Sequence, residues 1–167
     1  MRPLVVFSHG KESGPRGGKI EYLSRLAEQH GCRVLSIDYT DLADPDERVK
    51  RLVSIDFGEH SRLILAGSSM GGYVSALASK TLSPAGLFLM APAFYLPGYQ
   101  EQRPKAKAGH TLVVFGWEDE VIPVEHAVRF SREMKAELHI FDSTHRLLDV
   151  LPEVGSLFQL FLKKCLA

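Results

Sequence analysis

Hydrophobic residues in this chain form short, nearly continuous runs that are separated by more polar segments. Runs in which apolar and polar residues do not alternate are typical of parallel strands that are covered on both faces. Six such runs recur along the 167 residues: Leu4–Phe7, Val34–Ile37, Leu63–Ala66, Leu87–Met90, Leu112–Phe115 and Leu138–Phe141. We therefore predict six strands, although one serine interrupts the second run and one histidine the sixth.

Apolar residues between these runs follow a helical period, in which positions i, i+3, i+4, i+7 and i+8 share one face. The pattern is present at Ile20, Leu23, Leu26 and Ala27, and again at Val154, Leu157, Phe158, Phe161 and Leu162. Alternating strands and helices predict the α/β class: a single domain over residues 1–167, built as a three-layer α/β/α sandwich around a mostly parallel six-stranded sheet. In such folds, ligands bind in the loops at the carboxyl ends of the strands.

One connection differs from the others. Residues 91–109, "APAFYLPGYQEQRPKAKAG", contain three prolines and three aromatic residues and show no helical period. We predict a loop that lies over the face where ligands bind. Its cations Arg103, Lys105 and Lys107 could contact a phosphate, but alternating charges of this kind usually form a solvated surface.

Composition narrows the classes of partner. Twenty Lys and Arg balance twenty Asp and Glu, so no overall field attracts nucleic acid or anionic lipid. Only about five apolar residues precede Ser8 and His9, whereas a secretion signal needs roughly 7 to 15, and no stretch approaches the roughly 18 residues of a membrane span. The two cysteines, Cys32 and Cys165, show neither metal-ligand nor disulfide spacing. We expect a cytoplasmic protein without a bound metal, whose partner is a small molecule.

The third apolar run is followed by a motif that could carry a catalytic serine. Residues 63–80, "LILAGSSMGGYVSALASK", place Gly67, Ser69 and Gly71 in the pattern G-x-S-x-G between a strand and a helical segment. In a nucleophile elbow, the serine hydroxyl projects from a sharp turn, and the glycines leave room for neighbouring backbone. An ordinary glycine-serine turn would give the same letters, but the strand before it and the helix after it favour Ser69 as a nucleophile.

A serine hydroxyl needs a base and an acid that orients the base. The fifth run is followed by "FGWEDEVIPVEHA" and the sixth by "FDSTHRLLD", which offer Asp119 and His145. The order Ser69, Asp119, His145 is the order expected for a serine hydrolase on an α/β sheet. Asp142, Glu118 and Glu120 compete as the acid. Six other histidines compete as the base, but His145 is favoured because it lies in a loop after a strand.

At this point the chain resembles the α/β-hydrolases, and among them the small bacterial serine esterases that lack a lid. "SHGKESGPRGGKI" is similar to the His-Gly loop of that family, "GSSMGG" to its elbow, "GWEDEVIP" to its acid turn and "STHRLL" to its histidine loop. The resemblance implies Ser69 as nucleophile, His145 as general base and then general acid, and Asp119 as the orienting carboxylate. The two leading strands of the full-length fold, a cap and an HGGG signature are absent.

The glycine-rich stretch after the first run could bind either a phosphate or a transient oxyanion. A P-loop is excluded, because aligning Gly18 and Lys19 with its Gly-Lys pair puts Ser13 at the first glycine and Ile20 at the hydroxyl position. A dinucleotide fingerprint fails at residues 67–72, where Ser69 replaces the second glycine. The hydrolase interpretation instead predicts an oxyanion hole formed by the backbone N–H groups of Met70 and Lys11.

These assignments predict hydrolysis of a small carboxylic ester or thioester through an acyl-enzyme, without a cofactor. The aromatic and aliphatic side chains nearest to an acyl pocket are expected to be Phe94, Tyr95, Leu96 and Tyr99, although the same rings could instead fill a small core beneath the loop. Two other functions remain open at this stage: a thioesterase or peptidase acting on proteins, and a binding protein that has the fold without the chemistry.

Overall fold

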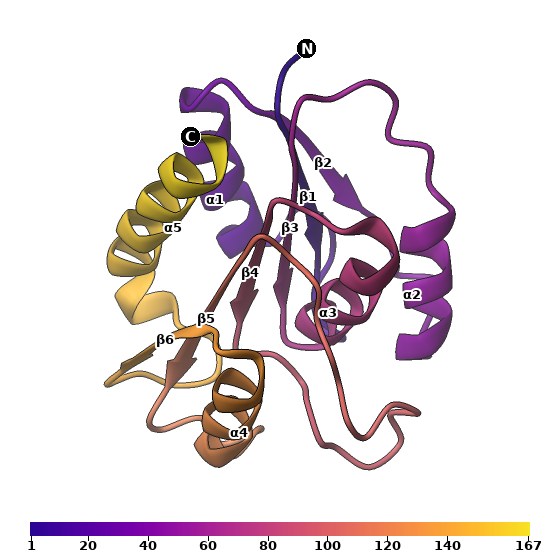
Figure 1. Ribbon diagram of the computed structural model, residues 1–167. Helices are drawn as coiled ribbons and strands as arrows, with labels where there is room; N and C mark the ends of the chain where they lie inside the picture. The colour runs from indigo at the N-terminus through magenta and orange to yellow at the C-terminus, as the bar shows by residue number, and fades with distance from the viewer.

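A parallel sheet of six strands forms the centre of the molecule, as seen in the computed structural model, which describes residues 1–167 (Figure 1). The strands are β1 (Leu4–Ser8), β2 (Arg33–Ile37), β3 (Leu63–Ser68), β4 (Gly86–Met90), β5 (His110–Gly116) and β6 (Glu137–Phe141). Their order is β2-β1-β3-β4-β5-β6, and every neighbouring pair is parallel. The six predicted strands and the parallel sheet are confirmed.

Burial explains why the hydrophobic runs are continuous. Every residue of the inner strands β1, β3 and β4 is buried, so both faces of each strand must be apolar or small. The edge strands β2 and β6 contain exposed or half-buried positions, and these two runs are the ones that a serine and a histidine interrupt.

Helices cover both faces of the sheet, which confirms the three-layer sandwich. They are α1 (Gly18–Gln29), α2 (Pro45–Ser54), α3 (Met70–Leu82), α4 (Val124–Met134) and α5 (Leu151–Leu166), with a short 3₁₀ turn at Leu148–Val150. Helices α1 and α5 pack side by side on one face, and α2, α3 and α4 lie on the other (Figure 1). None of the helices is long and apolar enough to cross a membrane.

Aromatic side chains fill the core between the sheet and α5. The ring of Phe88, in β4, lies 5.0 Å from Phe158 and 5.4 Å from Phe161 between centroids, and Phe7 in β1 lies 6.1 Å from Phe158. The two phenylalanines of α5 belong to the helical pattern seen in the sequence. That pattern is therefore the face that α5 packs on the sheet.

The connection between β4 and β5 has no helix, as predicted, but only its first half lies at the carboxyl edge of the sheet. There the backbone N–H of Gln100 donates to Asp46 of α2 at 3.1 Å. Its second half runs along α3 and α4 to the opposite edge, where the N–H of Lys107 donates to Ser79 at 2.9 Å. The cations of this half thus lie away from the carboxyl ends of the strands.

Candidate active site

Ser69 occupies the sharp turn between β3 and α3. Its backbone has φ 55° and ψ −117°, a conformation that residues with a Cβ rarely adopt. The flanking glycines are required here, because a Cβ on Gly67 would overlap the carbonyl of Gly71, and a Cβ on Gly71 would overlap the carbonyl of Ser8 in β1. The close approach of three backbone segments therefore determines the residue types of the G-x-S-x-G motif.

The structure brings Ser69, His145 and Asp119 together. The Ser69 hydroxyl donates to Nε2 of His145 at 3.0 Å, and Nδ1 of His145 donates to Oδ2 of Asp119 at 2.7 Å. Because the carboxylate can only accept, the ring carries its proton on Nδ1, and Nε2 is free to take the serine proton. The three residues come from the ends of β3, β5 and β6, and none is supplied by a helix interior.

Both oxygens of Asp119 are engaged. Oδ1 accepts hydrogen bonds from the backbone N–H groups of Val121 at 2.8 Å and Ile122 at 2.7 Å, while Oδ2 holds His145. The Asp119 side chain is fully buried, whereas 14% of the His145 side chain is exposed. The acid is therefore fixed in place, and the imidazole still reaches solvent.

The loop after β1 lies against Ser69. A Cβ on Gly10 would lie 3.5 Å from the Cβ of Ser69. The buried ring of His9 donates from Nδ1 to the carbonyl of Gly10 at 2.8 Å and accepts at Nε2 from the N–H of Tyr39 at 2.9 Å. Acceptance at Nε2 requires a neutral ring with its proton on Nδ1, in agreement with a pKa of His9 that burial lowers. His9 is thus a structural residue that shapes the peptide before Lys11.

A hydrolase of the alpha/beta superfamily from Xanthomonas campestris pv. campestris is similar to this chain over nearly its whole length. The identity is 30%, the match covers 98% of this chain and 99% of that one, and the TM-score is 0.88. This chain belongs to the α/β-hydrolase superfamily.

Two further solved structures share the fold of this α/β hydrolase. Est1E from Butyrivibrio proteoclasticus is 20% identical, with a TM-score of 0.78 over 99% of this chain and 88% of that one. A serine hydrolase without a lid from Xanthomonas campestris is 18% identical, with a TM-score of 0.68 over 96% and 81%. No protein-family model and no curated protein matches the sequence.

The competing acids lie apart from the imidazole of this α/β hydrolase. Asp142 and Glu118 are exposed and make no hydrogen bond to it. Glu120 accepts only from the backbone N–H of His145, at 3.5 Å. Two of the competing histidines bond to other groups: His126 to the carbonyl of Phe94, and His139 to Glu137. Of the candidate pairs, only Asp119 and His145 are aligned with Ser69.

The two predicted oxyanion donors belong to the segments next to Ser69: Met70 follows it in the chain, and Lys11 follows Gly10, whose added Cβ would lie 3.5 Å from the Ser69 Cβ. Met70 begins α3, so its N–H belongs to the first helical turn, whose N–H groups have no acceptor within the helix. Lys11 follows Gly10, whose N–H donates to the Ser13 hydroxyl at 3.0 Å. The Lys11 side chain is exposed, which agrees with a role limited to its backbone.

Arg48 of α2 supports this loop and was not identified from the sequence. It is 2% exposed, and its guanidinium donates to the carbonyls of Gly10 at 3.2 Å, His9 at 3.4 Å and Leu42 at 2.7 Å. In the sequence, Arg48 stands in a charged segment, "PDERVKR", that is typical of a solvated helix. What distinguishes Arg48 from an ordinary surface arginine is its contact with Gly10, 38 residues earlier in the chain, which the sequence does not reveal.

The proposed pocket residues do not form one wall. Phe94 is completely buried and stacks on Phe130 at 4.2 Å, so its ring belongs to the core. Tyr95 lies beneath the guanidinium of Arg129, 4.1 Å from the ring centroid. The half-buried Tyr99 packs edge-on against Tyr73 at 4.9 Å, and Leu96 is also half-buried. Leu96 and Tyr99 therefore remain the candidates for substrate contact.

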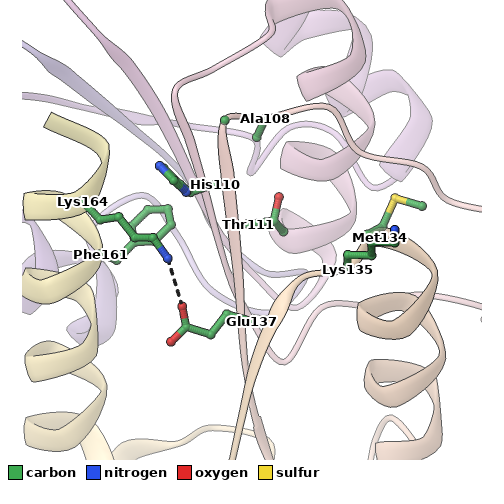
Figure 2. A pocket seen from close by; sticks show the side chains of 9 residues that line it. Ala108, His110, Thr111, Met134, Lys135, Glu137, Phe161 and Lys164 are labelled. Atoms are coloured by element: carbon green, nitrogen blue, oxygen red, sulfur yellow. Dashed lines mark ion pairs between the residues drawn. The ribbon is translucent and has the colours of Figure 1, made fainter. Parts of the chain in front are cut away.

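Two cavities lie away from the Ser69 site. One, of about 480 Å³, runs along the outer side of α4 beside Trp117, which is 57% exposed. The other, of about 230 Å³, lies at the amino ends of β5 and β6, where Lys164 and Glu137 face each other at 3.8 Å (Figure 2). Neither is lined by Ser69, His145 or Asp119, so neither is part of the site of this α/β hydrolase.

Proposed function

We propose that this α/β hydrolase is a serine hydrolase that cleaves small carboxylic esters or thioesters through an acyl-enzyme. The principal support is the imidazole of His145, which is bonded on one side to the Ser69 hydroxyl at 3.0 Å and on the other to the buried Asp119 at 2.7 Å. A serine so paired has a base within reach of its proton, as nucleophilic catalysis requires.

In the first half of the proposed reaction, Ser69 Oγ bonds to the substrate carbonyl carbon while its proton passes to Nε2 of His145. The carbonyl electron pair moves to oxygen, and the N–H groups of Met70 and Lys11 stabilise the oxyanion. When the tetrahedral intermediate collapses, the bond to the leaving oxygen or sulfur breaks. That atom takes the proton from His145, and the acyl group stays on Ser69.

In the second half, water repeats these steps. It gives a proton to His145, attacks the acyl carbon and releases the carboxylic acid, and the proton returns to Ser69. The fold neighbour Est1E has been solved with ferulic acid bound, and ferulic acid is itself a carboxylic acid. That complex is consistent with release of an acid product from a site on this fold.

A fluorophosphonate tests the proposal, because it phosphonylates only an activated serine. We expect one adduct by mass, located on Ser69, in the wild-type protein and in the surface variant Ser156→Ala, and no adduct in Ser69→Ala. Absence of an adduct from the wild type would instead favour a non-catalytic binding protein. A panel of acetyl esters, thioesters and peptides then ranks substrates, and a clear preference for peptides or acylated proteins would overturn the small-ester assignment.

A further inference from the structure

The backbone of Gly10 is held on both sides by side chains. Its carbonyl accepts from Nδ1 of His9 at 2.8 Å and from Nη1 of Arg48 at 3.2 Å. Its N–H donates to the Ser13 hydroxyl at 3.0 Å, and the carbonyl of His9, in the same peptide unit as that N–H, accepts from Arg48 at 3.4 Å. The two peptide units that meet at Gly10 are therefore both fixed in orientation.

The peptide unit that follows Gly10 also contains the N–H of Lys11. In a trans peptide the C=O and the N–H point in opposite directions, and the chain contains no cis peptide. Because His9 and Arg48 hold the carbonyl, the N–H is directed away from them. It donates to no acceptor within the protein, and neither does the N–H of Met70. Both predicted oxyanion donors are thus unpaired N–H groups, as binding of a transient anion requires.

Arg48 places a buried positive charge behind this peptide unit. The residue is 2% exposed, and none of the eight ion pairs within 4.0 Å includes it. Its guanidinium donates to three carbonyls, those of Leu42 at 2.7 Å, Gly10 and His9, and lies 5.5 Å from the centroid of the Tyr39 ring. A buried cation without a carboxylate is costly. Negative charge that forms nearby during a reaction would offset part of that cost.

We propose that Arg48 is a positioning residue for the hydrolysis, which directs and polarises the N–H of Lys11 through the carbonyl of Gly10. This inference rests on the proposed function. When Ser69 attacks, negative charge develops on the substrate oxygen, and the bond from the Lys11 N–H to that oxygen strengthens. A charged donor on the carbonyl polarises the peptide and makes its N–H a stronger donor. Arg48 therefore stabilises the transition state more than the bound substrate, and its effect belongs to kcat rather than to KM.

Matched substrates test the proposal. In 4-nitrophenyl acetate the charge develops on oxygen, whereas in 4-nitrophenyl thionoacetate it develops on sulfur, which is a weaker hydrogen-bond acceptor. Loss of a whole oxyanion donor costs about 10² to 10³ in rate, and we expect a group that acts through the donor to contribute less. The ratio of kcat/KM values, acetate over thionoacetate, should fall roughly tenfold in Arg48→Met, with the KM for the acetate nearly unchanged.

Two further variants separate charge, geometry and general effects on α2. Arg48→Lys keeps the charge but lacks the planar fork that bridges the carbonyls, so its ratio should lie between those of Arg48→Met and the wild type. Arg51→Met is the control, because Arg51 lies three residues later in α2 and donates to the carbonyl of Asp38 and the carboxylate of Asp41 instead. Its ratio should match that of the wild type.

A second measurement does not depend on turnover. Ser69 Oγ adds to the carbonyl carbon of a trifluoromethyl ketone while the serine proton passes to His145, and the adduct retains the oxyanion. The dissociation constant of 1,1,1-trifluorohexan-2-one should rise roughly tenfold in Arg48→Met and stay unchanged in Arg51→Met. If Arg48→Met does not fold, the same two measurements on Arg48→Lys decide.

An unchanged substrate ratio and an unchanged ketone affinity in the Arg48 variants would overturn the inference. An equal loss of kcat/KM on the two esters would also overturn it, because Arg48 would then have a purely structural role. In both cases, fluorophosphonate labelling of Ser69 would leave the proposed function intact. Absence of that labelling from the wild type would remove the proposed function itself.

Discussion

Three hydrogen bonds to Asp119 determine which ring nitrogen of His145 carries the proton. Two backbone N–H groups fix one carboxylate oxygen, and the other oxygen is left for His145. The carboxylate therefore cannot rotate without breaking buried bonds. This arrangement keeps Nε2 of His145 unprotonated and directed at Ser69.

Replacing Asp119 by Asn should move the proton of the His145 ring from Nδ1 to Nε2. The amide oxygen of the new side chain would stay with the N–H groups of Val121 and Ile122, so its NH₂ would face Nδ1 of His145 and force the proton onto Nε2. We expect kcat to fall by about 10⁴ on any ester that the enzyme accepts, measured by steady-state kinetics. Asp142→Asn, at an exposed position, should stay within about twofold of the wild type. If Asp142→Asn is the crippled variant, the acid is misassigned.

The residues that sequence analysis could identify are those whose turn has a local pattern. Ser69 is marked by the glycines around it, and Asp119 and His145 follow apolar runs. Arg48 has no such mark, because its role depends on a loop from a distant part of the chain. Phe94 is an intermediate case, since the sequence left open whether its ring lines a pocket or fills a core beneath the loop, and the structure places it in the core.

Among the larger elements, the connection from β4 to β5 is held in place by a side chain of α3 and one of α2. The Tyr73 hydroxyl donates to Asp46 at 2.6 Å and accepts from the N–H of Glu101 at 3.0 Å, and the N–H of Gln100 donates to the second oxygen of Asp46. Burial and the Asp46 carboxylate raise the pKa of Tyr73, so its phenol remains a donor at any ordinary pH.

Removing the Tyr73 hydroxyl should loosen this connection. In Tyr73→Phe, Asp46 loses a hydrogen-bond donor and the N–H of Glu101 loses its acceptor, both in a partly buried position. We therefore expect the free energy of unfolding, measured by urea titration, to be lower by about 1–3 kcal/mol. Proteolysis within residues 96–103 should become faster. Tyr22→Phe is the control, since the Tyr22 hydroxyl makes no hydrogen bond within the protein. Equal stability and equal proteolysis of the two variants would show that the Tyr73 hydroxyl does not hold the connection.

Strand positions were predictable from the sequence, whereas the course of this connection was not. Continuous apolar runs are a direct result of burial on both faces of a parallel sheet. By contrast, residues 91–109 are fixed by hydrogen bonds between backbone groups and distant side chains, such as Ser79 with Lys107. No periodicity records bonds of that kind, so the segment was expected to stay over the site throughout.

For the molecule as a whole, the net charge is zero, but one lysine ammonium lies in a partly buried position where its charge is destabilising. The chain has as many acidic as basic residues, yet Lys19 holds its charge in a partly buried position beside Arg146 and Asp119. Below about pH 8, Lys19 is protonated in both the folded and the unfolded state, and the folded state bears the full penalty. Between about 8 and 10.5, only the unfolded state stays protonated, so the penalty declines as pH rises.

Lys19→Met should accordingly be more stable than the wild type at pH 7, by on the order of 1–3 kcal/mol. The difference should shrink as pH rises through 8 to 10.5, when followed by chemical denaturation at several pH values. Lys163→Met controls for the loss of an exposed lysine and should show no such trend. A Lys19→Met difference that is constant with pH would mean that this ammonium is not penalised by burial.

Trp117 is the single tryptophan of the chain, and it lies two residues before Asp119 with more than half of its surface in water. Its backbone N–H donates to the carbonyl of Phe141, at the end of the strand that leads to His145. Tryptophan fluorescence, excited selectively at the red edge of the absorption band, therefore reports from one place only, the junction of the turns that carry Asp119 and His145. Quenching by acrylamide would follow ligand arrival at that junction without any attached dye.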